Sequence, residues 1–210
     1  MADWVTISAL STAGGTLVLA AATFASVRSA NRAARAAERA LLAGIRPALV
    51  PSRLEDPPEK VGFADDHWVR VAGGKAVLEV TDEAIYLAMA LRNVGSGLAV
   101  LDRWDFYPER ATGDLSHREP DAFRRLTRDI YVPAGDRGFW QGAIRDRADP
   151  MFAAASEAIR ARRTITVDLL YGDHEGGQRT ISRFSFLPGA EDQWLTAVSR
   201  HWNLDRADPR

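Results

Sequence analysis

The sequence predicts a mainly β protein, in which an antiparallel β-sandwich follows an N-terminal transmembrane helix. Three observations lead to this prediction. The stretch Trp4–Val27 contains 24 residues without a charge, and a segment rich in alanine and arginine follows it. From Arg46 onward, short apolar runs alternate with turn residues, as they do in antiparallel sheets. A mixed α+β sheet is the second choice for this last part.

Residues 1–27 are predicted to form a membrane span. As a helix, Trp4–Val27 would reach about 36 Å, which is more than the roughly 30 Å of a hydrocarbon core. A signal peptide would begin with a positively charged region, whereas this chain begins with Met-Ala-Asp. Small residues four apart, such as Ser11 and Gly15, would let two such helices approach closely. Homo-oligomerisation through this helix is therefore one expectation about partners.

Residues 28–45 are predicted to continue as a basic juxtamembrane helix. Four arginines share one helical face because they are spaced by four, three and four residues: Arg28, Arg32, Arg35 and Arg39. Gly44 and Pro47 mark the end of this helix. Since positive flanks stay in the cytoplasm, we expect a single-pass protein of the cell inner membrane, with the N-terminus outside and the C-terminal domain in the cytoplasm. The arginines either contact anionic headgroups or form a solvated face.

Residues 46–189 are predicted to form the β-domain. Its strands and hairpins are expected in the runs RPALVPSRL, HWVRV-AGG-KAVLEV, AIYLAMALRNV, LAVLDRWDFY, RDIYV-PAGDRG-FWQGAI and TITVDLLYG-DHEGG-QRTISRFSFLP. The last of these is the strongest hairpin signal, because apolar residues alternate on both sides of a glycine turn. Eight or nine short strands with regular turns are typical of an immunoglobulin-like sandwich.

Two short helices are expected in addition. The first, DPMFAAASEAIRARR, has Asp149 as its N-cap, Pro150 at its first position and arginines at its C-terminal end. The second lies within residues 190–210, which are predicted to form a C-terminal helix and tail. There the run EDQWLTAVSRHW places Trp194, Val198 and Trp202 on one helical face. Both tryptophans are assigned to the core.

The motif Asn93-Val94-Gly95-Ser96-Gly97 lies between two apolar runs and could be read as a phosphate loop or a nucleophile turn. A dinucleotide loop needs a third glycine at position 100, which is valine, and a helix after it. An esterase elbow needs glycines two residues on either side of Ser96, and both are absent. A structural turn at Asn93, Gly95 and Gly97 is predicted instead, because Asn and Gly accept the positive φ of tight turns.

The segment Leu91–Ala99 is similar to the strand-turn-strand N-x-G-x-x-A signature of bacterial immunoglobulin-like sandwich modules. The layout of the chain also resembles that of uncharacterised bacterial, actinobacterial-type single-pass membrane proteins. In those proteins a span and a basic helix precede an R-P-x-L-V strand and a cytoplasmic sandwich. The resemblance implies a bacterial membrane protein with an immunoglobulin-like domain, and it brings no catalytic residues with it.

No metal or cofactor is expected from the sequence. The chain has no cysteine, and its four histidines lack the spacing of helical metal ligands. Asp173-His174-Glu175 is the most suggestive polar cluster, but two glycines follow it between two β runs, which indicates a hairpin tip. The net charge of -1 argues against a nucleic-acid partner.

The expected function is non-enzymatic. We expect a membrane-anchored protein-interaction or scaffold module on the cytoplasmic face of a bacterial membrane. Its expected partners are the lipid bilayer and an unidentified protein. Two alternatives stay open. One is a loop-built enzyme or small-ligand sensor that uses Asp173, His174, Glu175 and His67. The other is a membrane-acting effector that oligomerises through its transmembrane helix.

Overall fold

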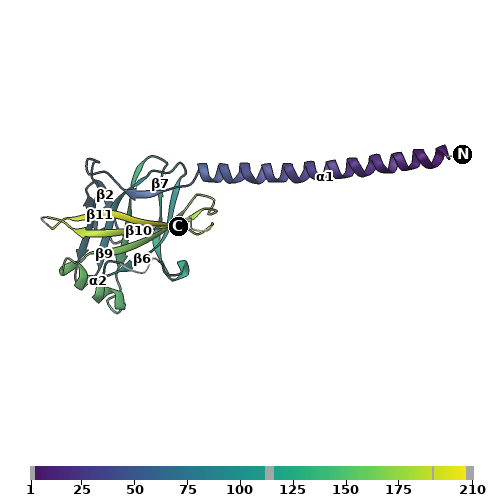
Figure 1. The fold of residues 1–210 in the computed structure, drawn as a ribbon. Coiled ribbons are helices and arrows are strands. Elements are labelled where there is room, and N and C mark those ends of the chain that lie inside the picture. Colours follow the sequence, from purple (N-terminus) through teal and green to yellow (C-terminus); the bar gives the residue numbers. More distant parts are fainter. Residues whose placement is uncertain (1–2, 112–115, 191, 207–210) are drawn as a thin grey trace. The chain divides into compact units, whose positions relative to one another are not determined.

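The computed structural model describes residues 3–111, 116–190 and 192–206, and it divides the chain after Gly44 into two compact units. The first unit is a single long helix and the second is a β-rich domain with one short α-helix (Figure 1). Each unit is described by itself below.

Helix α1 (Trp4–Gly44) is continuous through the predicted span and the predicted basic segment. Its stretch Ile7–Leu42 is long and apolar enough to cross a membrane, and none of the apolar window is buried inside the protein. The hydroxyls of Ser11, Thr12 and Thr16 donate to carbonyls four residues earlier at 2.8–2.9 Å. These side chains are therefore already hydrogen-bonded within the helix, as a lipid environment requires. The prediction of an N-terminal helix that is long and apolar enough to span a membrane is therefore confirmed.

In the described part of the second unit, nine antiparallel strands form one sheet that curls into a half-barrel (Figure 1). The strands are β1 (Leu49–Pro51), β4 (Lys75–Val80), β5 (Ile85–Asn93), β6 (Ala99–Tyr107), β7 (Arg124–Val132), β8 (Arg137–Ile144), β9 (Ile165–Gly172), β10 (Arg179–Pro188) and β11 (Trp194–Asn203). Their order is β1-β5-β4-β11-β10-β9-β6-β7, and β8 pairs along β5. The expected antiparallel β-structure is thus present. The immunoglobulin-like sandwich is not confirmed, because these strands curl as one sheet.

A separate two-stranded sheet contains β2 (Glu59–Gly62) and β3 (Trp68–Val71). The expected hairpin between HWVRV and KAVLEV is wrong, because β3 pairs with β2 whereas β4 pairs with β5 and β11. The reason is burial. The valines of the small sheet pack on the outer face of β5, where Tyr86, Ala88 and Ala90 point away from the main core. The strongest predicted hairpin, β9–β10, is confirmed over eight paired positions.

The helix predicted near the C-terminus is wrong, since Trp194–Asn203 is strand β11 and pairs with β10. Trp194, Val198 and Trp202 are four residues apart, and residues at i and i+4 share a face in a helix and in a strand alike. The pattern was therefore ambiguous. In the structure Trp194 and Val198 pack on the main core, whereas Trp202 lies in a separate cluster with Phe123, Leu170 and Ile181, because a register shift between Arg183 and Phe184 changes the face that the end of β11 presents.

The main core fills the concave side of the half-barrel and includes Trp104, Trp140, Phe106, Phe184 and Phe186. Helix α2 (Pro150–Arg160) adds Ala155, Ala158 and Ile159 to this core. Its N-cap is confirmed, because the Asp149 side chain accepts a hydrogen bond from the Met151 amide at 2.9 Å. A short 3₁₀ helix, η1 (Pro120–Ala122), precedes β7.

The predicted turn after β5 is present, but its glycines do not have positive φ. They are required by close backbone approach instead. A Cβ on Gly95 would lie 2.3 Å from the Arg46 carbonyl oxygen, and one on Gly97 would lie 1.7 Å from that of Ile45. Asn93 is buried, and its side chain bonds the amides of Ala48 and Gly95 and the carbonyls of Gly97 and Val132. The turn therefore holds the first residues of the β-domain in place.

Candidate functional site

An open seam lies between β7 and β8, which are consecutive in sequence but do not form a ladder with each other. β7 pairs with β6, and β8 pairs with β5. The turn between them is bonded to β5 instead: Asn93 donates to the Asp136 carbonyl and accepts from the Gly135 amide, both at 3.0 Å. Because the sheet does not close here, one backbone edge of each strand is left without a strand partner in the described residues.

A bulge in β7 lies along this seam. Leu101 of β6 lies opposite Ile130, whereas Arg103, only two residues further, lies opposite Arg125. The segment Leu126–Asp129 of β7 therefore has a single facing residue on β6 and leaves the ladder. Bulges of this kind re-aim side chains and occur next to functional sites more often than elsewhere.

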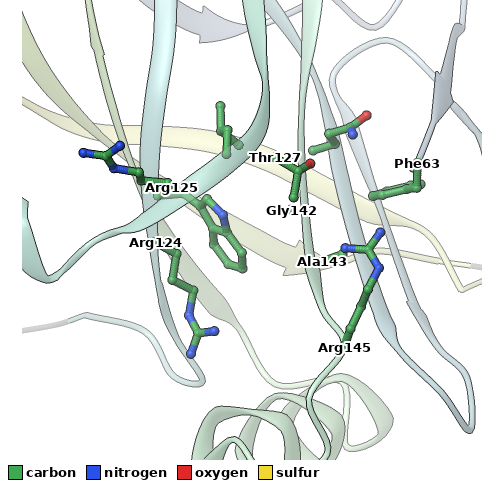
Figure 2. A pocket seen from close by; sticks show the side chains of 10 residues that line it. Phe63, Arg124, Arg125, Thr127, Gly142, Ala143 and Arg145 are labelled. Carbon is green, nitrogen blue, oxygen red and sulfur yellow. The ribbon is translucent and has the colours of Figure 1, made fainter. Parts of the chain in front are cut away.

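A cavity of about 140 Å³ occupies the seam (Figure 2). Trp104 and Phe63, which are both buried, give it apolar walls. Its polar side chains are those of three arginines, a threonine and a glutamine: Arg124, Arg125, Arg145, Thr127 and Gln141. None of the described residues that line it is acidic. The composition of the lining therefore favours a negatively charged ligand.

Two of the arginines are held by aspartates that lie outside the cavity lining. The distance from Arg124 Nη1 to Asp149 Oδ2 is 2.7 Å, and that from Arg145 Nε to Asp65 Oδ2 is 2.9 Å. The hydrogen bond from Arg145 lowers the pKa of Asp65 to about 2, and the one from Arg124 lowers the pKa of Asp149. Since a guanidinium carries five N–H donors, each pair fixes an arginine and leaves further donors available.

Arg125 and Gln141, which also line the cavity, form fewer contacts than these two arginines. Arg125 is exposed, and no described residue pairs with its guanidinium. Gln141 is only 4% exposed, and its Oε1 accepts a hydrogen bond from Arg128 at 2.9 Å. This bond assigns Oε1 as the acceptor, so Nε2 is the donor end, and no described residue accepts from it. Nε2 is not among the buried side-chain atoms that lack a partner, so it keeps contact with solvent.

The predicted polar cluster lies at the turn between β9 and β10, away from the seam in the sheet order. His174 and Glu175 are exposed, with their side chains 3.9 Å apart. Asp173 is buried, and its Oδ1 accepts from the Gly177 amide at 2.8 Å. Gly176 has a φ of +73° in this turn. These contacts are those of a hairpin tip.

The other residues that the sequence analysis singled out lie elsewhere in the structure. His67 Nε2 lies 2.8 Å from Glu79 Oε2, and its ring stacks on Tyr86 with centroids 3.9 Å apart, so it ties the small sheet to β5. The basic stripe lies exposed on α1: Arg28, Arg32, Arg35 and Arg39. Among the described residues, no group of three or more His, Cys, Asp or Glu side chains could hold a metal ion.

Sequence reasoning missed a charged row that crosses the outer face of the half-barrel. Asp105 of β6, Asp168 of β9 and Arg183 of β10 are successive cross-strand partners. Arg183 donates from Nε and Nη2 to the two carboxylate oxygens of Asp168, both at 2.7 Å, and the pair is buried. Arg118 donates to Asp105 at 3.1 Å. Burial, with the nearby carboxylates of Asp168 and Asp105, raises the pKa of Tyr107 beside this row. Only the register, which the sequence does not display, brings these charges together.

A second missed contact joins Ser182 Oγ to His201 Nδ1 at 2.6 Å. A serine and histidine in contact can form a nucleophile, but Ser182 is 0% exposed, and its hydroxyl also lies 2.8 Å from the Tyr171 hydroxyl. Tyr171 in turn accepts from the Leu49 amide at 3.1 Å. The contact therefore belongs to a buried chain of hydrogen bonds across the sheet.

Comparisons with known proteins identify no relative of this chain. No family model matches it, and no curated protein matches it. One solved structure, the β-glucosidase from Kluyveromyces marxianus, aligns over 60% of this chain and 14% of its own, with 12% identity and a TM-score of 0.21. At that TM-score the likeness supports no conclusion about fold or function.

Proposed function

We propose that this chain is a membrane-anchored, non-enzymatic binding module of a bacterial inner membrane. Helix α1 crosses the bilayer with the N-terminus outside, and the β-domain meets a protein partner on the cytoplasmic face. In this proposal the domain is a variant of the immunoglobulin-like modules that the Leu91–Ala99 motif resembles.

The observation that carries the proposal is the exposed apolar helix. Large apolar side chains along it, such as Leu10, Leu17 and Phe24, are each at least two-thirds exposed. Exposed apolar surface of this extent is costly in water and is stabilised in a bilayer. The four arginines that follow favour a cytoplasmic flank.

The seam supports the interaction part of the proposal. It combines unpaired strand edges with arginine and aromatic side chains, which are the residue types enriched in protein interfaces. A small-ligand sensor is the second candidate, because a cavity lies in the seam and arginines but no described acidic residues line it.

Two experiments test the proposal. The full chain should stay in the membrane fraction after carbonate extraction, whereas a chain beginning at Ile45 should be released; release of the full chain would contradict the anchor. For topology, single cysteines can replace Ala2 or Glu175, since the chain has no other thiol. A membrane-impermeant maleimide should label Ala2→Cys in intact, wall-stripped cells and should label Glu175→Cys only after lysis. The reverse pattern would place the β-domain outside.

Photo-crosslinking tests the protein partner. A crosslinking residue at exposed Thr127 in the seam should trap a defined protein from membranes, and one at exposed Arg147, which has no described partner, should not. Equal crosslinking at both positions would remove the seam from the proposal without affecting the anchor.

A further inference from the structure

We infer that a groove beside strand β4 binds an extended segment of a partner protein, which adds to the sheet as a further strand. The inference rests on the proposed function, because the segment belongs to the protein partner proposed there. β4 and β8 pair with opposite edges of β5, so this groove is a different surface from the seam. Its test depends neither on the anchor nor on crosslinking in the seam.

Strand β11 covers only the first part of β4. Their ladder begins at Trp194, which lies opposite Ala76, and β4 continues beyond it to Val80. Before Trp194 the chain turns back toward β10, with which β11 forms a hairpin. In the described part of the sheet, the second half of β4 therefore has a strand on one side only, which is β5.

The register shows which main-chain groups of β4 point toward the uncovered side. The Thr196 amide donates to the Gly74 carbonyl at 3.0 Å, so even-numbered residues of this strand face β11. The Thr81 amide donates to the Ala84 carbonyl at 2.9 Å, so odd-numbered residues face β5. The last two even-numbered residues of β4 therefore direct their N–H and C=O groups away from β5, to the side that β11 does not cover.

These two residues are Leu78 and Val80. Among the hydrogen bonds of the described residues, none engages their main chain on this side. Leu78 is only 8% exposed, so little of it can bond water instead. Main-chain groups that are buried nearly always have a partner. An extended segment next to β4 would supply one, because it presents N–H and C=O groups at the spacing of a strand.

A groove of about 310 Å³ runs along residues 76–79 of β4, where these groups are directed. Its apolar walls include Leu78 and Trp194, which are both buried. Four residues of an extended strand span about 13 Å, so the groove matches a short segment and not a folded domain. Main-chain hydrogen bonds would hold the segment, and these walls would contact the side chains on one of its faces.

The charge of the groove favours an acidic residue in the segment. Arg70, which lines the groove, lies directly opposite Lys60 in the small sheet, and like charges in that arrangement are unfavourable. The described contact of Lys60 is with the Trp68 ring, and no described carboxylate pairs with Arg70. The other charged side chains of the lining already have partners within the domain: Lys75 with Gln193, Glu79 with His67, and Asp192 with Arg162. A carboxylate on the segment would therefore pair with Arg70.

Amide hydrogen exchange, measured by NMR on the full chain in nanodiscs, tests whether this edge is free. The Leu78 and Val80 amides should exchange at least about tenfold faster than the neighbouring odd-numbered amides, which are bonded to β5. Equal protection of even-numbered and odd-numbered amides would mean that the edge is already covered, and the inference would be wrong.

The probe for binding is the acetylated and amidated peptide TVEVT, which combines an extended backbone with one acidic side chain. It should shift the signals of the Leu78 and Val80 amides and slow their exchange. The same peptide with N-methylated valines should not, because it lacks the donors that face β4. TVKVT should bind about threefold more weakly, since Arg70 repels its lysine.

Val80→Pro is the matched protein variant, because it removes an outward N–H group and leaves the ladder with β5 intact. It should weaken binding of TVEVT about tenfold, and Arg70→Ala should weaken it about threefold. Arg147→Ala, which removes an exposed arginine that does not line the groove, should leave the affinity unchanged. Melting temperatures close to that of the parent chain would show that the variants fold.

Three results would overturn the inference. The first is the absence of any shift with TVEVT at millimolar concentration. The second is binding that persists both with the methylated peptide and in Val80→Pro. The third is an oligomer of the full chain that Val80→Pro dissociates in light scattering, because the occupant would then be a second copy of this chain. Carbonate extraction and crosslinking at Thr127 test the proposed function separately.

Discussion

Gly97 lies so close to Ile45 that a Cβ atom on Gly97 would stand 1.7 Å from the Ile45 carbonyl oxygen. Ile45 is the first residue after helix α1, and the next residue, Arg46, donates to Asn203 at 3.0 Å and forms an ion pair with Asp205. The motif that looks like a nucleotide loop in the sequence is thus the place where the β-domain fixes its own first residues.

Gly97→Ala should destabilise the β-domain, because the methyl group forces either the turn or the Ile45 backbone to move. We expect a loss on the order of 1–3 kcal/mol in the free energy of unfolding. Gly177→Ala is the matched control, since its Cβ would meet only Asp173 Oδ2 at 3.8 Å. Thermal melts of the full chain in detergent would compare the two. A control as damaging as Gly97→Ala would show that close approach is not the cause.

At the β9–β10 tip, His174→Ala should cost well under about 1 kcal/mol, as exposed substitutions usually do. Asp173→Ala should cost more, about 1–2 kcal/mol, because it removes the buried acceptor of the Gly177 amide. Chemical denaturation measures both. If His174→Ala is the more disruptive change, the histidine has a role that the tip geometry does not explain.

Asp168→Asn should be among the most damaging substitutions in the domain. It leaves the buried guanidinium of Arg183 without its bidentate carboxylate, for which the usual loss is about 3–5 kcal/mol. The double variant Asp168→Leu with Arg183→Met should recover part of that loss, since neither charge then remains buried. If the double variant is less stable than Asp168→Asn, then Arg183 stabilises other neighbouring carboxylates in addition to that of Asp168.

The Asp65–Arg145 pair should contribute to acid stability. The folded pKa of Asp65 is about 2 against an ordinary 3.8, so folding favours the ionised carboxylate. Its contribution is complete above about pH 4 and is lost as the pH falls toward 2. Arg145→Gln should therefore lower the melting temperature at pH 6, and its difference from the parent chain should shrink between pH 4 and pH 2. The pair is partly exposed, so the effect is small, well under about 1 kcal/mol. A difference that does not vary with pH would assign the effect to packing.

The sequence predicts elements better than it predicts their pairing. The candidate span, the N-cap at Asp149 and the β9–β10 hairpin are local patterns, and each is found where it is expected. Strand partners depend on burial between distant segments. For that reason β3 was wrongly paired with β4, and the period of β11 could not be told from that of a helix.

The cavity in the seam could not be predicted from the sequence for the same reason. Arg124 and Arg125 are adjacent charged residues, and nothing in their spacing connects them with Arg145 or Gln141. Leu126 and Ile130 are four residues apart and so keep the alternation of a regular strand, which is why the bulge between them could not be predicted from the sequence.

The bulge in β7 also affects whether two copies of the protein can pair along the edge of this strand. The uncovered edge of a strand can recruit a strand from a neighbouring molecule and seed aggregation. In β7, the segment Leu126–Asp129 bends out of register and carries charged Arg128 and Asp129 on its exposed side, so an incoming strand cannot continue a ladder along it. The same irregularity that interrupts the ladder thus makes this edge a poor template for strand pairing between copies of the chain.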